Sequence, residues 1–146
     1  MKSEDNWVSF PVESETGTRH IATVRTGLEK YLSCGKYICR IDVALEYAAS
    51  ADGMPIEDEA GVIDACTEAF KSATTKDPAA LLIYLTTGEG RRVWTFQTRS
   101  LHIFRNIFNR ALEPFEVIPF EITAAEDPEM EEYRFFLEAA ESLREE

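Results

Sequence analysis

Residues 79–98 restrict the fold more than any other stretch of the sequence. They read AALLIYLTTGEGRRVWTFQT, in which an apolar run and a glycine-bearing turn precede a segment of alternating large and polar residues. A short apolar run bounded by turn residues is typical of a buried strand, and a short loop with glycine joins antiparallel strands. The stretch therefore predicts a β-hairpin, whose second strand turns Trp94 and Phe96 towards the core. The polar side chains of this strand, such as Thr95 and Gln97, are expected on a solvated face.

Four other segments have the alternation or the composition of strands. They are residues 6–12, 19–26, 37–47 and 115–123. The first two flank a turn-rich stretch and predict an N-terminal hairpin. Pro119 in the last segment indicates an edge strand, because proline cannot donate a hydrogen bond to a neighbouring strand.

Apolar residues at helical spacing predict three helices. Two cover residues 56–73 and 100–113, and the third closes the chain, with Asp127 as its N-cap and Pro128 at its first helical position. From residue 37 onward the order is strand, helix, strand, strand, helix, strand, helix. This is the split βαβ, or ferredoxin-like, order with an added C-terminal helix. We therefore expect one α+β domain over residues 1–146, with an antiparallel sheet, an N-terminal hairpin and helices on one face of the sheet.

Composition predicts a soluble cytoplasmic protein. The longest apolar run is far too short to span a bilayer, and the first ten residues, MKSEDNWVSF, do not resemble a signal peptide. Three cysteines, an odd number, argue against a disulfide framework. Cys39 and Cys66 fall among core positions of a strand and a helix, whereas Cys34 is expected to meet solvent.

Charge is unevenly distributed along the chain. The 27 acidic and 15 basic side chains give a net charge of -12, yet residues 91–110 contain five arginines and no carboxylate. One interpretation is internal balance, in which these arginines face the glutamates of the closing helix. The other is a binding site for a small anion formed by Arg91, Arg99 and Arg105. A net negative charge and inward-facing aromatic residues disfavour nucleic-acid binding.

No catalytic or metal motif is present in the sequence. A cysteine hydrolase would need Cys34 beside His20 or His102, and nothing in the spacing brings them together. Cys34, Cys39 and a histidine are a poor zinc set, because two cysteines at this spacing are not specific. The sequence thus predicts no catalytic residue, no metal ligand and no cofactor-binding residue.

The closing helix contains an aromatic residue on its polar side. Phe135 points away from the apolar face of this helix and lies among Glu131 and Glu138. The N-terminal hairpin could cover it. Otherwise an exposed aromatic side chain surrounded by carboxylates is suited to anchoring a basic protein partner.

Several segments resemble an uncharacterised bacterial family, domain-of-unknown-function family 695. They are LTTGEGRRVWTFQT, DPEMEEYRFFLEAA, DGMPIEDE and the N-terminal region with Trp7 and RTGL. Members of this family are often joined to modules similar to ribonuclease E inhibitor protein B, an acidic ferredoxin-like regulator. Those modules have a related Asp-Pro-Glu-Trp-x-x-Tyr segment, and here Met130 stands where the tryptophan would be. The resemblance implies a fold and a class of protein, and it carries over no site residue.

These observations give a leading hypothesis and one alternative. The leading hypothesis is a small acidic binding or regulatory module that acts by protein–protein contact, through Phe135, Glu131 and Glu138. The alternative is a small-anion-binding protein or enzyme that uses the arginine surface. The sequence does not indicate the partner or the oligomeric state.

Overall fold

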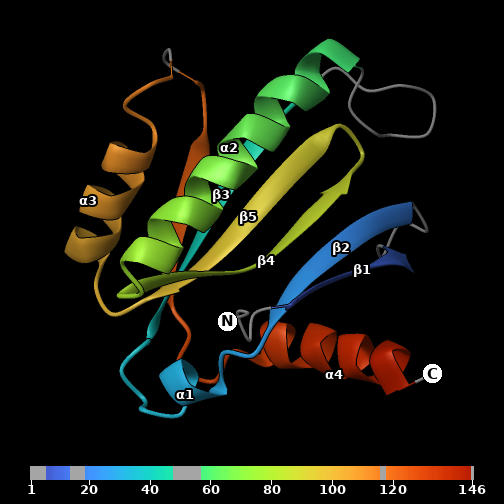
Figure 1. Cartoon of the computed structure of the whole chain (residues 1–146), viewed down its shortest axis with the longest axis vertical. Coiled ribbons are helices and arrows are strands. Elements are labelled where there is room, and N and C mark those ends of the chain that lie inside the picture. Colours follow the sequence, from blue (N-terminus) through green and yellow to red (C-terminus); the bar gives the residue numbers. More distant parts are fainter. Residues whose placement is uncertain (1–5, 14–18, 48–56, 116–117, 146) are drawn as a thin grey trace.

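The computed structural model describes residues 6–13, 19–47, 57–115 and 118–145 (Figure 1). Its strands are β1 (Asn6–Glu13), β2 (Arg19–Thr26), β3 (Cys39–Glu46), β4 (Ala80–Gly88), β5 (Arg91–Thr98) and β6 (Glu121–Glu126). Its helices are α1 (Glu29–Leu32), α2 (Glu57–Lys76), α3 (Leu101–Ala111) and α4 (Glu131–Glu145). The described residues form a single small α+β domain.

One six-stranded antiparallel sheet organises the domain, in the order β1-β2-β4-β5-β3-β6. The predicted β4–β5 hairpin is confirmed and lies in the middle of this order. The N-terminal hairpin of β1 and β2 is also confirmed, and it extends the sheet through antiparallel pairing of β2 with β4. The last strand of the chain, β6, lies at the edge beyond β3.

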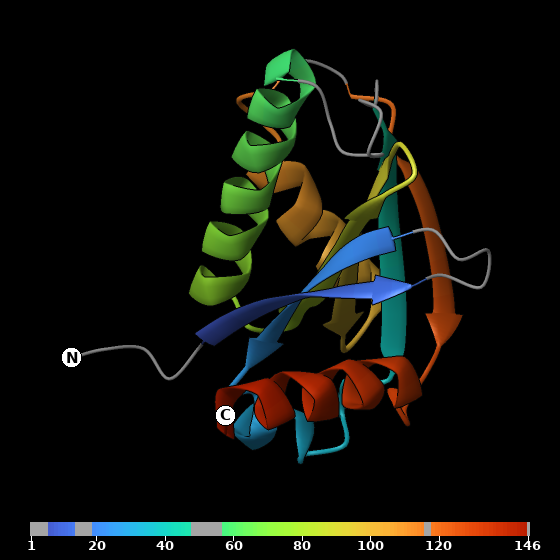
Figure 2. The same ribbon diagram turned by 90° about the vertical axis from the view of Figure 1, so that its right-hand side faces the viewer.

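The sheet has a hydrophobic core on each face, because β4 is apolar on both sides. Leu82 and Leu85 belong to a core shared with α2 and α3, whereas Leu81 and Ile83 belong to a core shared with α4. The prediction that the helices cover one face is therefore wrong for α4. Figure 2 shows α2 along one side of the strands and α4 lying across their ends, beside β1, β2 and α1.

Aromatic rings fill the first core. The ring of Phe70 on α2 lies edge-on to Trp94 and Phe96, with centroids 5.2 and 5.4 Å apart, and it stacks on Phe108 of α3 at 5.5 Å. Trp94 and Phe96 are only 0% and 2% exposed, so their predicted inward orientation is confirmed. Such tilted and stacked ring pairs contribute more than the burial of their area alone.

The second core joins the two ends of the described chain. Tyr133, Phe136 and Ala140 of α4 pack with residues of β1 and β2 that include Phe10 and Val24. The hydroxyl of Tyr133 also donates a hydrogen bond to the backbone carbonyl of Arg25, 2.7 Å away and 108 positions earlier in the chain. Helix α4 thus covers the N-terminal hairpin.

Two predicted boundaries are wrong. The final strand begins at Glu121 rather than at residue 115, because the ring of Phe120 packs into the first core at 5.9 Å from Trp94. The closing helix begins at Glu131 rather than at Pro128. The Asp127 carboxylate accepts a hydrogen bond from the backbone N–H of Met130, whose positive φ of 52° closes a turn ahead of the helix.

The expected solvated face of β5 is also wrong, because Thr95 and Gln97 are both fully buried. The side-chain amide of Gln97 donates to the carbonyls of Tyr37 and Asp127, each at 2.8 Å. These two residues belong to the segments that enter β3 and follow β6. Gln97 therefore fastens both segments to the centre of the sheet.

Candidate functional site

An open groove of about 910 Å³ lies between β6 and the beginning of α4. Its floor contains Arg40 and Asp42 of β3 and the 123–126 segment of β6. Its wall runs from Asp127 through the turn into α4 and includes Phe135. The groove exists because β6 reaches Asp127 and the chain then turns back over the sheet as α4.

Arg40 is the centre of an ion-pair network on the floor of the groove. Alternation along β3 puts Arg40 and Asp42 on the same face, and Arg40 Nε lies 3.1 Å from Asp42 Oδ1. Its Nη2 donates to Glu132 Oε1 at 2.6 Å, and its Nη1 lies 3.8 Å from Asp127 Oδ2. One guanidinium group therefore holds together β3, the turn after β6 and the first turn of α4.

Two buried hydroxyl groups complete this network. Tyr84 of β4 donates to the Glu132 carboxylate, and Thr95 of β5 donates to Asp42 Oδ1 at 2.8 Å. Burial raises the pKa of Tyr84, and the neighbouring Glu132 carboxylate raises it further. Burial alone would lower the pKa of Arg40, but Tyr84, Asp42 and Glu132 together outweigh that effect and raise it. The network therefore consists of a firmly charged arginine and a firmly neutral tyrosine.

The groove is strongly acidic. Among the residues that line it, all in the described part of the chain, Arg40 is the single cation. Six carboxylates accompany it: Asp42, Glu126, Asp127, Glu129, Glu131 and Glu132. Since the Arg40 charge already pairs with three of them, the groove as a whole attracts cationic groups.

Phe135 stands exposed at the rim of the groove. It is 66% exposed, because Tyr133 and Phe136 on either side of it turn into the second core. The interpretation that the N-terminal hairpin covers Phe135 is therefore wrong. Glu131 lines the same groove, and Glu138 is exposed on α4 about one turn beyond Phe135.

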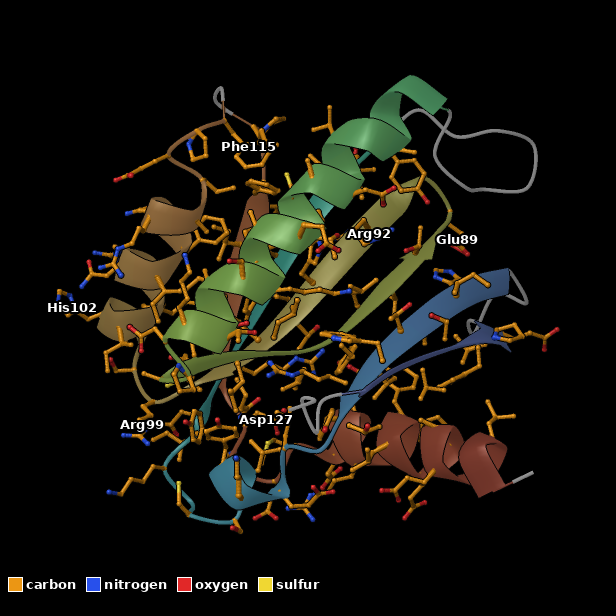
Figure 3. All side chains as sticks on the ribbon, viewed as in Figure 1. Glu89, Arg92, Arg99, His102, Phe115 and Asp127 are labelled. Atoms are coloured by element: carbon orange, nitrogen blue, oxygen red, sulfur yellow. The ribbon has the colours of Figure 1, made fainter. Side chains whose placement is uncertain are left out.

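The three arginines of the alternative hypothesis are not brought together. Arg91 begins β5 and Arg99 follows its end, so at about 3.3 Å per residue their backbones lie roughly 26 Å apart. Arg91 Nη2 pairs with Glu121 of β6 at 3.2 Å, and the Arg99 guanidinium lies 5.1 Å from the ring centre of Tyr37, at the α1 end of the sheet (Figure 3). Arg105 lies on the exposed side of α3.

Arg92 has a structural role that the sequence did not indicate. Its guanidinium donates to the hydroxyl groups of Thr67 and Thr87, at 3.0 and 2.6 Å, and lies 5.6 Å from the ring centre of Trp94. Burial lowers its pKa. The pairing expected between the 91–110 arginines and the closing helix is made instead by Arg40, which lies outside that segment.

The thiol and imidazole groups lie apart. Cys34 is exposed in the connector after α1, whereas His20 lies near the opposite end of β2, with Nε2 3.4 Å from Glu89 Oε2. His102 lies on the outer side of α3 (Figure 3). Cys66 is buried as predicted, and Cys39 is partly exposed. Within the described ranges, no three His, Cys, Asp or Glu side chains are placed to share a metal ion.

Met130 lies in the turn between β6 and α4. It is only 5% exposed and belongs to the second core. It therefore supports the turn behind the groove and does not present a contact surface.

None of the helices in the described part of the chain has the length and apolar character needed to cross a membrane.

Comparison with known proteins gives one family. The model of a family of unknown function, DUF695, matches residues 5–138, which include the six strands of the described structure and about half of α4. No curated protein and no solved structure matches the chain.

Proposed function

We propose that this chain, which belongs to the DUF695 family as its motifs predicted, is a protein-binding module whose contact surface is the acidic groove. The observation that carries this proposal is the position of Phe135 beside that groove. Phe135 is 66% exposed, so it stabilises the fold much less than a buried aromatic side chain does. It also lies next to an excess of carboxylates. Buried aromatic anchors contribute much of the binding energy of protein complexes, and complementary charge contributes to their specificity.

The rigidity of the groove supports binding rather than a solvated surface alone. Arg40, Tyr84 and Thr95 fix the carboxylates of Glu132 and Asp42 through hydrogen bonds. A surface held in one arrangement loses less conformational entropy when a partner binds. The partner is therefore expected to present lysine or arginine side chains at defined positions.

Three further expectations belong to this proposal. The strand order β4-β5-β3-β6, with α2 and α3 on one face, supports a ferredoxin-like arrangement extended by the N-terminal hairpin. A regulatory role agrees with the small size and the binding surface. The exposed free thiol of Cys34 agrees with a reducing compartment such as the cytoplasm.

The alternative of a small-anion site has less support. Arg91 and Arg99 lie at opposite ends of β5, and each already contacts another side chain. Trp94 and Phe96 are buried beneath α2 and are therefore not available for base stacking.

The proposal is tested by affinity capture from a lysate of the native host at low salt. Three baits are compared: the unmodified protein, Phe135→Ala, and Val62→Ala as a control at an exposed apolar residue of α2. We expect the same basic protein to be captured by the first and third baits, to be absent from the second, and to be released by moderate salt.

Two results would count against the proposal. One is capture of the same proteins by all three baits, and the other is retention that does not depend on salt. Nuclease treatment of a parallel sample separates protein capture from capture through nucleic acid. Loss of the captured material with nuclease would favour an arginine surface that binds RNA.

A further inference from the structure

The outer edge of β6 is open in the described structure. β6 ends the strand order and pairs with β3 alone, and all six of its residues are exposed. Open sheet edges present unpaired N–H and C=O groups, and proteins usually protect them. Here the edge borders the acidic groove, which is lined by the 123–126 segment of the same strand.

The pairing with β3 identifies which backbone groups face outward. The N–H of Asp127 donates to the carbonyl of Ile38 at 2.7 Å, so these two residues form a hydrogen-bonded pair. Hydrogen-bonded pairs alternate along an antiparallel ladder. The backbone groups of Ile122, Ala124 and Glu126 therefore point away from β3, towards the open edge.

The two faces of β6 differ in chemistry. Thr123 and Ala125 pair with Asp42 and Arg40 and share their face, which is the acidic groove. Ile122 points to the other face, where its apolar side chain is 45% exposed. A strand lying along this edge would thus meet the carboxylates of the groove on one face and, on the other, Ile122 and Ala124, with Glu126 at the end of the strand.

We propose that an extended segment of the partner protein, alternating lysine or arginine with apolar residues, binds as an additional antiparallel strand along the open edge of β6. This inference rests on the proposed function and specifies the partner's chemistry. Main-chain hydrogen bonds to Ile122, Ala124 and Glu126 supply affinity, and alternate side chains supply specificity. The basic side chains lie over the groove beside Phe135, and the apolar ones lie over Ile122.

Charge disfavours a second copy of this chain as the occupant. β6 begins with Glu121 and is followed by Asp127, so antiparallel pairing of two identical edges centred on Ala124 would place each Glu121 opposite the Asp127 of the other copy. Each copy also has a net charge of -12. Like charges directly opposite one another in a sheet are destabilising.

The geometry predicts which amides of the bound segment matter. In an antiparallel pair, directly opposed residues share a face, so the apolar residues oppose Ile122, Ala124 and Glu126 and direct their N–H groups at β6. The N–H groups of the basic residues point to solvent. N-methylation of the two sets of residues should therefore have unequal effects.

The probe is a labelled peptide, acetyl-Lys-Val-Lys-Val-Lys-Val-Lys-amide, with binding followed by fluorescence anisotropy at low salt. Two versions of equal charge each have three methylated backbone nitrogens, either those of the three valines or those of the three lysines that follow a valine. We expect methylation at valine to weaken binding at least about tenfold relative to methylation at lysine, because it removes up to three hydrogen bonds. Equal affinities, or no binding of the unmethylated peptide, would overturn the inference.

The protein offers a matched pair of variants at Ala124. Ala124→Pro removes an N–H that points away from β3, and proline is tolerated at such edge positions. Ala124→Ser keeps that N–H. We expect only the proline variant to lose peptide binding, with its fold checked by circular dichroism.

Hydrogen exchange provides a measurement that does not depend on the proline variant. Bound peptide should slow exchange at the amides of Ile122, Ala124 and Glu126 in the unmodified protein. If exchange there is unchanged and Phe135→Ala still loses binding, the groove remains the proposed contact surface but the partner does not bind as an added strand. Binding that is insensitive to Phe135→Ala would instead reject the proposed function. A dimer of the free protein in sedimentation experiments would favour a second copy and overturn the inference.

Discussion

The hydroxyl of Tyr84 on β4 donates a hydrogen bond to the carboxylate of Glu132 on α4, and the two residues are 48 positions apart in the chain. The same carboxylate oxygen accepts a hydrogen bond from Arg40 of β3. The ring of Tyr84 also packs edge-on against Phe136 in the second core, at 5.0 Å. The wall of the acidic groove is therefore fixed by a residue that belongs to the hydrophobic core.

Tyr84→Phe should lower the free energy of unfolding by about 1–2 kcal/mol at neutral pH. The variant keeps the ring and removes one hydrogen bond to a charged group, and such bonds contribute about 1.5–3 kcal/mol. The remaining bond from Arg40 to Glu132 limits the loss. Urea unfolding measures the difference, and an unchanged midpoint would contradict the role assigned to this hydroxyl.

The stability difference between these two proteins should shrink in alkaline solution. The pKa of Tyr84 is raised by folding, so its contribution is complete below the unfolded pKa of about 10 and is lost as the pH rises further. Phenylalanine has no such dependence. Urea midpoints between about pH 8 and 11 measure this trend, and a difference that stays constant over that range would contradict it.

Arg40→Met should destabilise the protein by roughly 1–3 kcal/mol, because it leaves three neighbouring carboxylates without their shared cation. Those carboxylates belong to Asp42, Asp127 and Glu132. Arg40→Lys should lose less, since lysine retains the charge without the planar set of donors. Thermal unfolding compares the two variants, and equal losses would show that the charge itself contributes little.

Thr67→Val should lower the free energy of unfolding by about 1–3 kcal/mol, because two buried donors lose their acceptor. The substitution changes the side-chain volume little. The Thr67 hydroxyl accepts hydrogen bonds from Trp94 Nε1 at 2.9 Å and from Arg92 at 3.0 Å. Thr67→Ser retains that oxygen and is the control. Urea unfolding followed by tryptophan fluorescence reports on stability, and equal losses in the two variants would assign the effect to the methyl group.

Phe135→Ala should leave stability within about 0.5 kcal/mol of the unmodified protein, because an exposed side chain makes few contacts. Phe136→Ala on the same helix should cost about 3–5 kcal/mol, since Phe136 is buried against Tyr84. Thermal unfolding distinguishes the two cases. Destabilisation of Phe135→Ala by more than about 1 kcal/mol would mean that its effect on binding could not be assigned to the groove.

Local pattern predicted most of the elements and little of how α4 completes the fold. The alternation around Trp94 and Phe96 identified the first core correctly. The same alternation predicted that Thr95 and Gln97 meet solvent, because it cannot indicate which remote segment covers a polar face. The buried Gln97 amide donates hydrogen bonds to carbonyls of two segments that are far from it in the sequence.

The candidate site was only partly accessible to sequence reasoning. The exposure of Phe135 follows from helical spacing, since its neighbours Tyr133 and Phe136 turn inward. The role of Arg40 does not follow, because two of its acidic partners come from a turn and a helix whose position depends on the whole sheet. The acidic groove became apparent only when β6 was placed next to β3.

The hydrogen bond from Tyr133 to Arg25 has a consequence for the order of events during synthesis. The apolar face of the N-terminal hairpin, including Phe10 and Val24, packs against a helix that the ribosome makes more than a hundred residues later. Because the ribosome adds about 5–20 residues per second, this apolar face stays exposed for several seconds before α4 is synthesised. The apolar face of this hairpin is therefore open to aggregation until α4 has been made, and removal of α4 would expose it again.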